Sequence, residues 1–311
     1  MPTMDQIKAL REATGAGMMD CKKALVENGD DLEKATDWLR AKGLASAAKK
    51  AGRVAAEGIV VAHVAADGAA LVEVNCETDF VTKNDRFRTL AGDLAKHVWE
   101  ANPSSVRDAG GMYEQVFAST GKTVDESLRE AVAVIGENIQ ARRFVRFARG
   151  SEFGIVHAYI HAGGTHGVLV EASADSAAAA SSDAFKALVN DLALHVCVSA
   201  PEFVRREEVP QSAFDRERAV QLEKTMAEGK DAAMAAKIAD GRMSKWYSEV
   251  CLLDQPFFKD DKKKVSAVVA ETAKSIGAKI EVARIARLVM GEGIEKAASD
   301  FAAEVAAQAG L

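Results

Sequence analysis

One strand-and-helix pattern occurs twice in this chain. The strand pattern of residues 58–64 returns at residues 154–160. A helix pattern returns 98 positions later, where Phe87, Leu90, Leu94, His97, Val98 and Pro103 match Phe185, Leu188, Leu192, His195, Val196 and Pro201. Repetition on this scale indicates a duplicated structural unit. The sequence therefore predicts an α+β fold with two related subdomains, each built on a small antiparallel sheet.

Each copy also ends with a helix and a strand, and here the two copies are 141 positions apart. The matching positions are Val124, Leu128, Gly136, Ile139, Arg143 and Arg146 with Val265, Val269, Gly277, Ile280, Arg284 and Arg287. In the first copy we expect the helix to run through Ile139, and the strand to cover residues 144–147.

The second copy holds 43 additional residues between Pro201 and Val265. Charge-rich helical patterns at 209–226 and 232–246 meet at a turn over 228–231, which predicts an inserted antiparallel helical hairpin of the coiled-coil kind. Its apolar stripe is wide enough only to pack one helix on the other. This width favours an arm that projects from the body over a lid that folds back across it.

The first fifty residues have the pattern of a compact three-helix bundle. Apolar residues at helical spacing end at Gly15, at Gly29 and at Gly43, and a basic linker is expected over residues 45–52. Neighbouring helical residues point about 100° apart, so Met18 and Met19 are not expected to face the same core. One of them would then be available for a protein contact, unless both fill gaps in a thin core.

A loop that follows one strand differs between the two copies. The first copy reads Asn75-Cys76-Glu77-Thr78-Asp79-Phe80-Val81, and the second reads Ser173-Ala174-Asp175-Ser176 followed by four alanines. Folding of the unit therefore does not require a phenylalanine at this place. Phe80 either packs into its own core or is presented to another molecule.

Composition restricts the function. The chain has 311 residues, compatible with roughly two domains, and its net charge of -6 lacks the basic excess that binding to nucleic acid usually needs. Its first twenty residues do not resemble a secretory segment, and no apolar run reaches membrane-spanning length. The four cysteines form no C-x-x-C pair, which is typical of a protein of the reducing cytoplasm without disulfides or zinc.

Catalytic patterns are weak. Residues 120–123 resemble part of a phosphate loop but lack the required preceding glycine, so a helix start is the better interpretation. His157, His161 and His166 lie near one turn without acidic or thiol partners at metal-ligand spacing. We therefore predict no enzyme activity, no cofactor and no metal site, and keep a metal-dependent enzyme as an alternative to be excluded by metal analysis.

Four segments together resemble the bacterial translation elongation factor Ts family. They are residues 14–25 (TGAGMMDCKKAL), residues 75–81 (NCETDFV), residues 136–139 (GENI) and residues 291–296 (GEGIEK). The resemblance extends along the whole chain. It implies a factor that binds elongation factor Tu in its GDP-bound and nucleotide-free forms and promotes GDP release. The sequence is compatible with a homodimer and with a dimer of heterodimers.

The resemblance also implies roles for particular residues. Asp79 and Phe80 would enter the partner beside its magnesium site, and Met18, Met19 and Lys23 would contact its GTPase domain. The further residues that it places at the partner surface are Thr78, Val81, Arg11, Gly136, His161 and Phe301.

The family layout divides the chain into five parts. They are a ubiquitin-associated-like module with linker at 1–54, core subdomains at 55–149 and at 150–208 with 252–291, the hairpin at 209–251, and a C-terminal helical module at 292–311. A peptide-binding adapter is the alternative in which residues 1–54 alone would account for binding.

Overall fold

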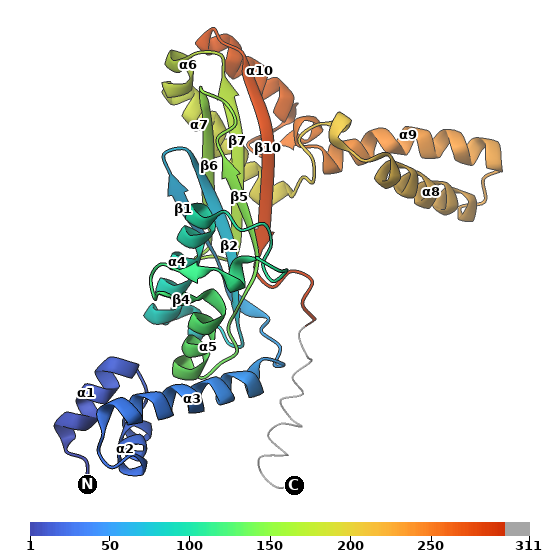
Figure 1. The fold of residues 1–311 in the computed structure, drawn as a ribbon. Helices are drawn as coiled ribbons and strands as arrows, with labels where there is room; N and C mark the ends of the chain where they lie inside the picture. Colours follow the sequence, from blue (N-terminus) through green and yellow to red (C-terminus); the bar gives the residue numbers. More distant parts are fainter. Residues whose placement is uncertain (296–311) are drawn as a thin grey trace.

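The computed structural model describes residues 1–295 of the chain and shows an elongated body with a helical module at one end and a long arm at its side (Figure 1). The body contains two three-stranded antiparallel sheets with the strand orders β1-β2-β5 and β10-β7-β6. Within this described part, no helix is long and apolar enough to span a membrane. The predicted mixed fold with duplicated sheets is confirmed.

The N-terminal module consists of α1 (Met4–Thr14), α2 (Met18–Glu27) and α3 (Leu32–Lys50). A capping box between Thr3 and Gln6 begins α1, and Gly15 ends it in a left-handed conformation with φ of 69°. The small core of the module contains Ile7, Leu10, Cys21, Ala24, Leu25 and Ala35.

The third helix is longer than the sequence pattern predicted. It continues through Gly43 to Lys50, so residues 45–50 of the basic linker expected over residues 45–52 are helix instead. The segment is rich in alanine, which has the highest helix propensity. A Cβ on Gly43 would lie 2.7 Å from the Cβ of Ala133 in α5 (Val124–Ile135), so the glycine permits close approach of the two helices. Packing therefore keeps Gly43 inside the helix.

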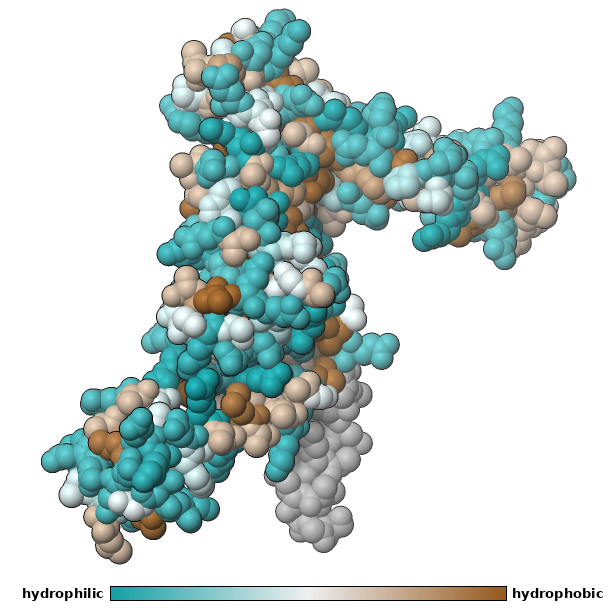
Figure 2. Space-filling view, in the orientation of Figure 1, coloured by the Kyte–Doolittle hydropathy of each residue, from teal (hydrophilic) through white to brown (hydrophobic). Residues whose placement is uncertain are grey.

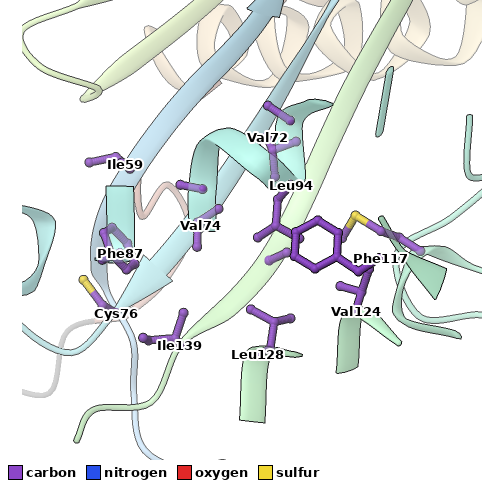
Figure 3. Close-up of a cluster of buried hydrophobic side chains, with 14 of the residues drawn as sticks. Ile59, Val72, Val74, Cys76, Phe87, Leu94, Phe117, Val124, Leu128 and Ile139 are labelled. Carbon is purple, nitrogen blue, oxygen red and sulfur yellow. The ribbon is translucent and has the colours of Figure 1, made fainter. Parts of the chain in front are cut away.

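The first subdomain pairs the hairpin β1 (Glu57–Ala65) and β2 (Gly68–Cys76) with β5 (Gln140–Ala148). Helices α4 (Asp85–Ala101) and α5 pack on the sheet, and apolar side chains from the sheet and from both helices converge in Figure 3. The short elements are η1 (Val81–Lys83), η2 (Met112–Glu114), β3 (Val116–Phe117) and β4 (Lys122–Thr123).

Both ends of α5 test the sequence predictions. Thr123 and Glu126 form a capping box at its start, which confirms that residues 120–123 precede a helix. The prediction that this helix reaches Ile139 is wrong, because Gly136 ends it in a left-handed conformation. Ile139 still packs in the core from the segment that leads to β5.

The second subdomain repeats this arrangement. Its sheet contains β6 (Gly154–His161), β7 (His166–Ala174) and β10 (Ile280–Val289), and its helices include α7 (Asp183–Ser199) and α10 (Val265–Ile276). The remaining elements are α6 (Ala177–Ser181), η3 (Arg206–Glu208), η4 (Leu252–Asp254), β8 (Pro256–Phe257) and β9 (Asp260–Lys264). Equivalent histidines bond equivalent glutamines: His97 to Gln115 at 3.0 Å and His195 to Gln255 at 2.8 Å. These matched contacts confirm the duplication.

The inserted segment forms α8 (Gln211–Ala227) and α9 (Ala232–Val250), joined by a short turn. The two helices bury Ala235, Ala239 and Met243, and an ion pair of 2.6 Å links Arg218 to Asp240. The predicted helical hairpin is confirmed, and Figure 1 shows it extending away from the body.

The two subdomains meet through the remaining faces of their sheets. Buried residues from both sheets form one cluster, namely Val60, Ala69, Leu71, Phe147, Leu169 and Leu288. Polar contacts join the strand ends. The buried Glu73 accepts hydrogen bonds from Arg143 and, at 2.8 Å, from the Gly291 amide, and Arg143 donates to the Val289 carbonyl at 2.8 Å.

The second subdomain makes the equivalent contact with the end of the first subdomain's closing strand. Glu171 accepts hydrogen bonds from Arg284 and from the Gly150 amide, and Arg284 donates to the Ala148 carbonyl at 2.6 Å. Each residue here occupies the position equivalent to its counterpart in the first contact. Each subdomain therefore holds the end of the other's closing strand, which fastens the two halves at two related points.

Candidate partner-binding site

The loop that distinguishes the two copies connects β2 to α4. Val81 is buried in the core of the first subdomain. Asn84 caps α4, because its side-chain oxygen accepts hydrogen bonds from the amides of Arg86 at 2.9 Å and Phe87 at 3.3 Å. The C-terminal side of the loop is therefore fixed by packing and by the cap.

The N-terminal side of the loop is held by Glu137, which lies just after α5. One carboxylate oxygen accepts hydrogen bonds from the amides of Glu77 at 3.0 Å and Thr78 at 2.9 Å. The other oxygen accepts a hydrogen bond from the Thr78 hydroxyl. Hydrogen bonds to an ionised acceptor are stronger than neutral ones. We call these three bonds the Glu137 clasp.

A second carboxylate, that of Glu77 in the loop, accepts a hydrogen bond from the segment that follows α5. The Asn138 amide donates to Glu77 at 2.7 Å, and the Asn138 side chain donates to the Arg53 carbonyl at 2.7 Å. Arg53 also forms an ion pair of 3.4 Å with Glu77. The base of the loop is thus connected to the chain that leaves α3.

Between these two fixed ends, Asp79 and Phe80 point outward. Phe80 is 77% exposed, so the alternative in which it packs into its own core is wrong. Lys83 lies 3.4 Å from the Asp79 carboxylate and 5.8 Å from the centre of the Phe80 ring. Figure 2 shows that the visible face is mainly hydrophilic with separate hydrophobic spots. An exposed aromatic ring on a well-anchored loop is suited to contact with another molecule.

The two methionines of the N-terminal module face different surroundings. Met18 is half-buried and packs against the module core, whereas Met19 is 74% exposed. The expectation that only one of them points outward is confirmed. Lys23 and Val26 are also exposed, and their spacing from Met19 places all three on one face of α2. Sequence analysis missed Val26, although its helical spacing could have revealed it.

Arg11 is exposed on α1 and lines a cleft of about 570 Å³ between the module and the first subdomain. Asn84, the cap next to the loop, lines the same cleft. The structure therefore brings Arg11 close to the start of α4.

The other predicted site residues are more dispersed. Gly136 is the left-handed residue directly before Glu137, with φ of 92°. His161 is exposed at the end of β6, in the second subdomain, and its Nδ1 lies 2.8 Å from the Tyr159 hydroxyl. Among residues 1–295, the ring contacts of His161 are with Tyr159 and His166 of its own hairpin and not with the loop. Phe301 and most of the predicted C-terminal module lie outside the described residues.

Burial shifts the pKa values of two side chains in the body. Burial raises the pKa of the Cys76 thiol to about 12, and the charge of Glu137 acts in the same direction. Burial also lowers the pKa of His195, whose hydrogen bond to Gln255 acts against this shift. Cys76 is thus a protonated, buried thiol that is unsuited to nucleophilic chemistry. Among the described residues, no three His, Cys, Asp or Glu side chains are grouped to hold a metal ion.

Sequence reasoning cited Glu137 and Asn138 only as part of a resemblance and gave neither a role. The internal repeat carried a usable signal. Glu77 keeps an acidic counterpart in Asp175, whereas the counterpart of Glu137 is Ala278. Comparison of the two copies would have marked Glu137 as particular to the copy with Phe80.

Fold and site together define a duplicated α+β protein that presents a firmly anchored loop with an aromatic tip, next to a small helical module with an exposed apolar face. These features are typical of a factor that acts by contacting another protein.

Comparison with known proteins identifies the family. The model of the family described as elongation factor TS matches residues 77–292. Elongation factor Ts of Trichlorobacter lovleyi is 49% identical over 99% of both chains, and that of Symbiobacterium thermophilum is 48% identical over 99% of this chain and 98% of its own. Elongation factor Ts of Clostridium botulinum is 43% identical over 100% of both. The chain belongs to the elongation factor Ts family, which implies a nucleotide-exchange role on elongation factor Tu in translation elongation.

Proposed function

We propose that this protein promotes GDP release from elongation factor Tu by inserting Asp79 and Phe80 beside the magnesium and nucleotide site of that partner. The observation that carries the proposal is the exposure of Phe80 on a loop whose two ends are fixed to the core. The two copies provide the comparison, because the unit also folds with Ala178 at the equivalent position.

An exchange factor lowers the affinity of its partner for a ligand, so it must bind the nucleotide-free state more tightly than the GDP-bound state. A Phe ring is a stiff apolar wedge that can separate packed elements. The Asp79 carboxylate would place negative charge where the partner holds a magnesium ion and phosphates. Neither side chain needs to form a covalent bond.

Binding is assigned to a separate surface. Met19, Lys23 and Val26 form an exposed face on α2 that combines apolar area with positive charge. We propose that this face anchors the N-terminal module to the GTPase domain of the partner, with Arg11 close by. Met18 supports the anchor from the module core. His161, Gly136 and Phe301 are kept as proposed contacts from the family resemblance.

The finer description of the chain follows the family layout. We propose a ubiquitin-associated-like module at 1–54, two core subdomains, a coiled-coil arm at 209–251, and a C-terminal helical module at 292–311. The protein would act in the cytoplasm on both the GDP-bound and nucleotide-free partner.

The proposal is tested by the release of fluorescent GDP from elongation factor Tu at increasing concentrations of this protein. Phe80→Ala should lower the maximal release rate by more than about tenfold, a loss above about 1.4 kcal/mol of transition-state stabilisation. Val116→Ala, which shortens another exposed side chain of the same subdomain, is the control and should leave the rate unchanged. An unchanged maximal rate for a folded Phe80→Ala variant would refute the wedge.

A further inference from the structure

The position of Glu137 suggests more than a contribution to folding. Its half-buried carboxylate accepts hydrogen bonds from two consecutive amides and one hydroxyl, all from the two residues that precede Asp79. The Thr78 carbonyl faces the Cys76 thiol, with sulfur and oxygen 3.2 Å apart. The peptide groups on both sides of Thr78 are therefore fixed.

Comparison with the second copy shows which of these hydrogen bonds belong to the repeated fold and which occur only in the first copy. Asp175 accepts a hydrogen bond of 3.0 Å from the Lys279 amide, in the same way that Glu77 accepts one from Asn138. This half of the contact occurs in both copies, so it belongs to the folding of the repeated unit. The Glu137 clasp has no equivalent, because Ala278 occupies that position.

The two differences between the copies coincide. Where the first copy has an exposed Phe80 and a Glu137 clasp, the second has Ala178 and Ala278. The equivalent of Thr78 is Ser176, and its hydroxyl caps the short helix α6 instead of binding a carboxylate. The clasp is thus present in the copy that carries the aromatic tip and absent from the copy that lacks it.

We propose that Glu137 is a positioning residue that holds the Asp79–Phe80 tip in its active conformation before the partner is met; this inference rests on the proposed function. A loop that becomes ordered only on binding loses conformational entropy at that step, and this loss lowers the affinity or the rate. With Glu77 and Thr78 already fixed on one side and Val81 buried on the other, the tip has little freedom left to lose. Glu137 itself need not touch the partner.

The test measures two independent properties of Glu137→Ala and Glu137→Gln. The first is hydrogen exchange of the Glu77 and Thr78 amides in the free protein, which needs no partner. The second is GDP release from elongation factor Tu, resolved into maximal rate and half-saturation concentration. Glu137→Ala should lose amide protection at both positions and lower the maximal rate about tenfold, with little change in half-saturation. Glu137→Gln keeps one acceptor oxygen and should restore part of both.

Asp175→Ala is the matched control, because it removes the repeated structural acid from the copy without a tip. It should lower the melting temperature without changing the maximal rate. If Glu137→Ala lowers the melting temperature but leaves amide protection and maximal rate unchanged, Glu137 is only structural and the inference is overturned. Phe80→Ala is measured alongside. If Phe80→Ala lowers the maximal rate but Glu137→Ala does not, the positioning role of Glu137 is overturned. The proposed function of the loop then still stands.

Discussion

Met18 and Met19 are adjacent in sequence but have different surroundings, which allows binding to be separated from exchange. Met19 presents apolar area on the surface of the module, whereas Met18 packs against the module core. Phe80 lies on another element of another subdomain. If the module captures the partner and the loop acts afterwards, changes at Met19 and Phe80 should affect different kinetic parameters.

We expect Met19→Ala to raise the half-saturation concentration and leave the maximal release rate nearly intact. Truncation of a partly buried side chain of this size at an interface costs about 1 to 3 kcal/mol of contact. The measurement is titration of the variant against a fixed amount of GDP-loaded elongation factor Tu. Leu32→Ala, an exposed side chain at the start of α3, serves as control. Equal loss of the same parameter in Met19→Ala and Phe80→Ala would contradict this division.

At the scale of elements, alignment of the two copies predicted the strands and helices of the body and the place of the inserted hairpin, because equivalent positions could be compared. Element ends were predicted less well. The sequence pattern placed a helix end at Gly43, where the structure uses a glycine for contact between α3 and α5. A residue that permits close packing and a residue that ends a helix look the same in one sequence.

The loop shows a second limit of sequence reasoning. The residues of its tip could be identified from the difference between the copies. Its exposure could not, because an isolated phenylalanine among polar residues is compatible with burial. The clasp joins residues about sixty positions apart. No local pattern indicates which of the nearby carboxylates reaches the loop amides.

The arm offers a prediction about an element. Replacing residues 219–239 with a short Gly/Ser linker should leave the cooperative unfolding of the body unchanged, because the first subdomain closes its sheet without such an insertion. The shortened arm keeps Arg218 next to Asp240 and the aromatic contact of Phe214 with Tyr247 at its base. Thermal unfolding followed by circular dichroism is the measurement. A broadened or lost transition would show that the outer arm is part of the core.

For the whole molecule, the central question is what keeps two subdomains in one arrangement. The sheets share apolar contacts, but apolar surfaces alone do not fix an orientation strongly. The paired contacts of Glu73 and Glu171 are directional and lie at the ends of both closing strands. We infer that they set the position of the second subdomain relative to the one that carries the loop.

The charge state of Glu73 makes this inference testable. Burial opposes ionisation, but hydrogen bonds from Arg143 and the Gly291 amide outweigh it, so the pKa of Glu73 lies below its ordinary value of 4.5. A carboxyl group whose pKa is lower in the folded than in the unfolded protein stabilises the fold above the unfolded value. That stabilisation is lost as the pH falls through the folded value.

Glu73→Gln should therefore reduce the free energy of unfolding by up to about 3 kcal/mol near neutral pH, because it removes the buried negative charge that pairs with Arg142 and Arg143. The difference from the unchanged protein should be constant above the ordinary carboxyl pKa and should shrink as the pH is lowered past it. Denaturant unfolding at several pH values measures this. Glu100→Gln, which breaks an exposed pair with Lys96, should cost less than about 1 kcal/mol. If Glu73→Gln costs no more than this control, the apolar contacts between the sheets are sufficient to join the subdomains.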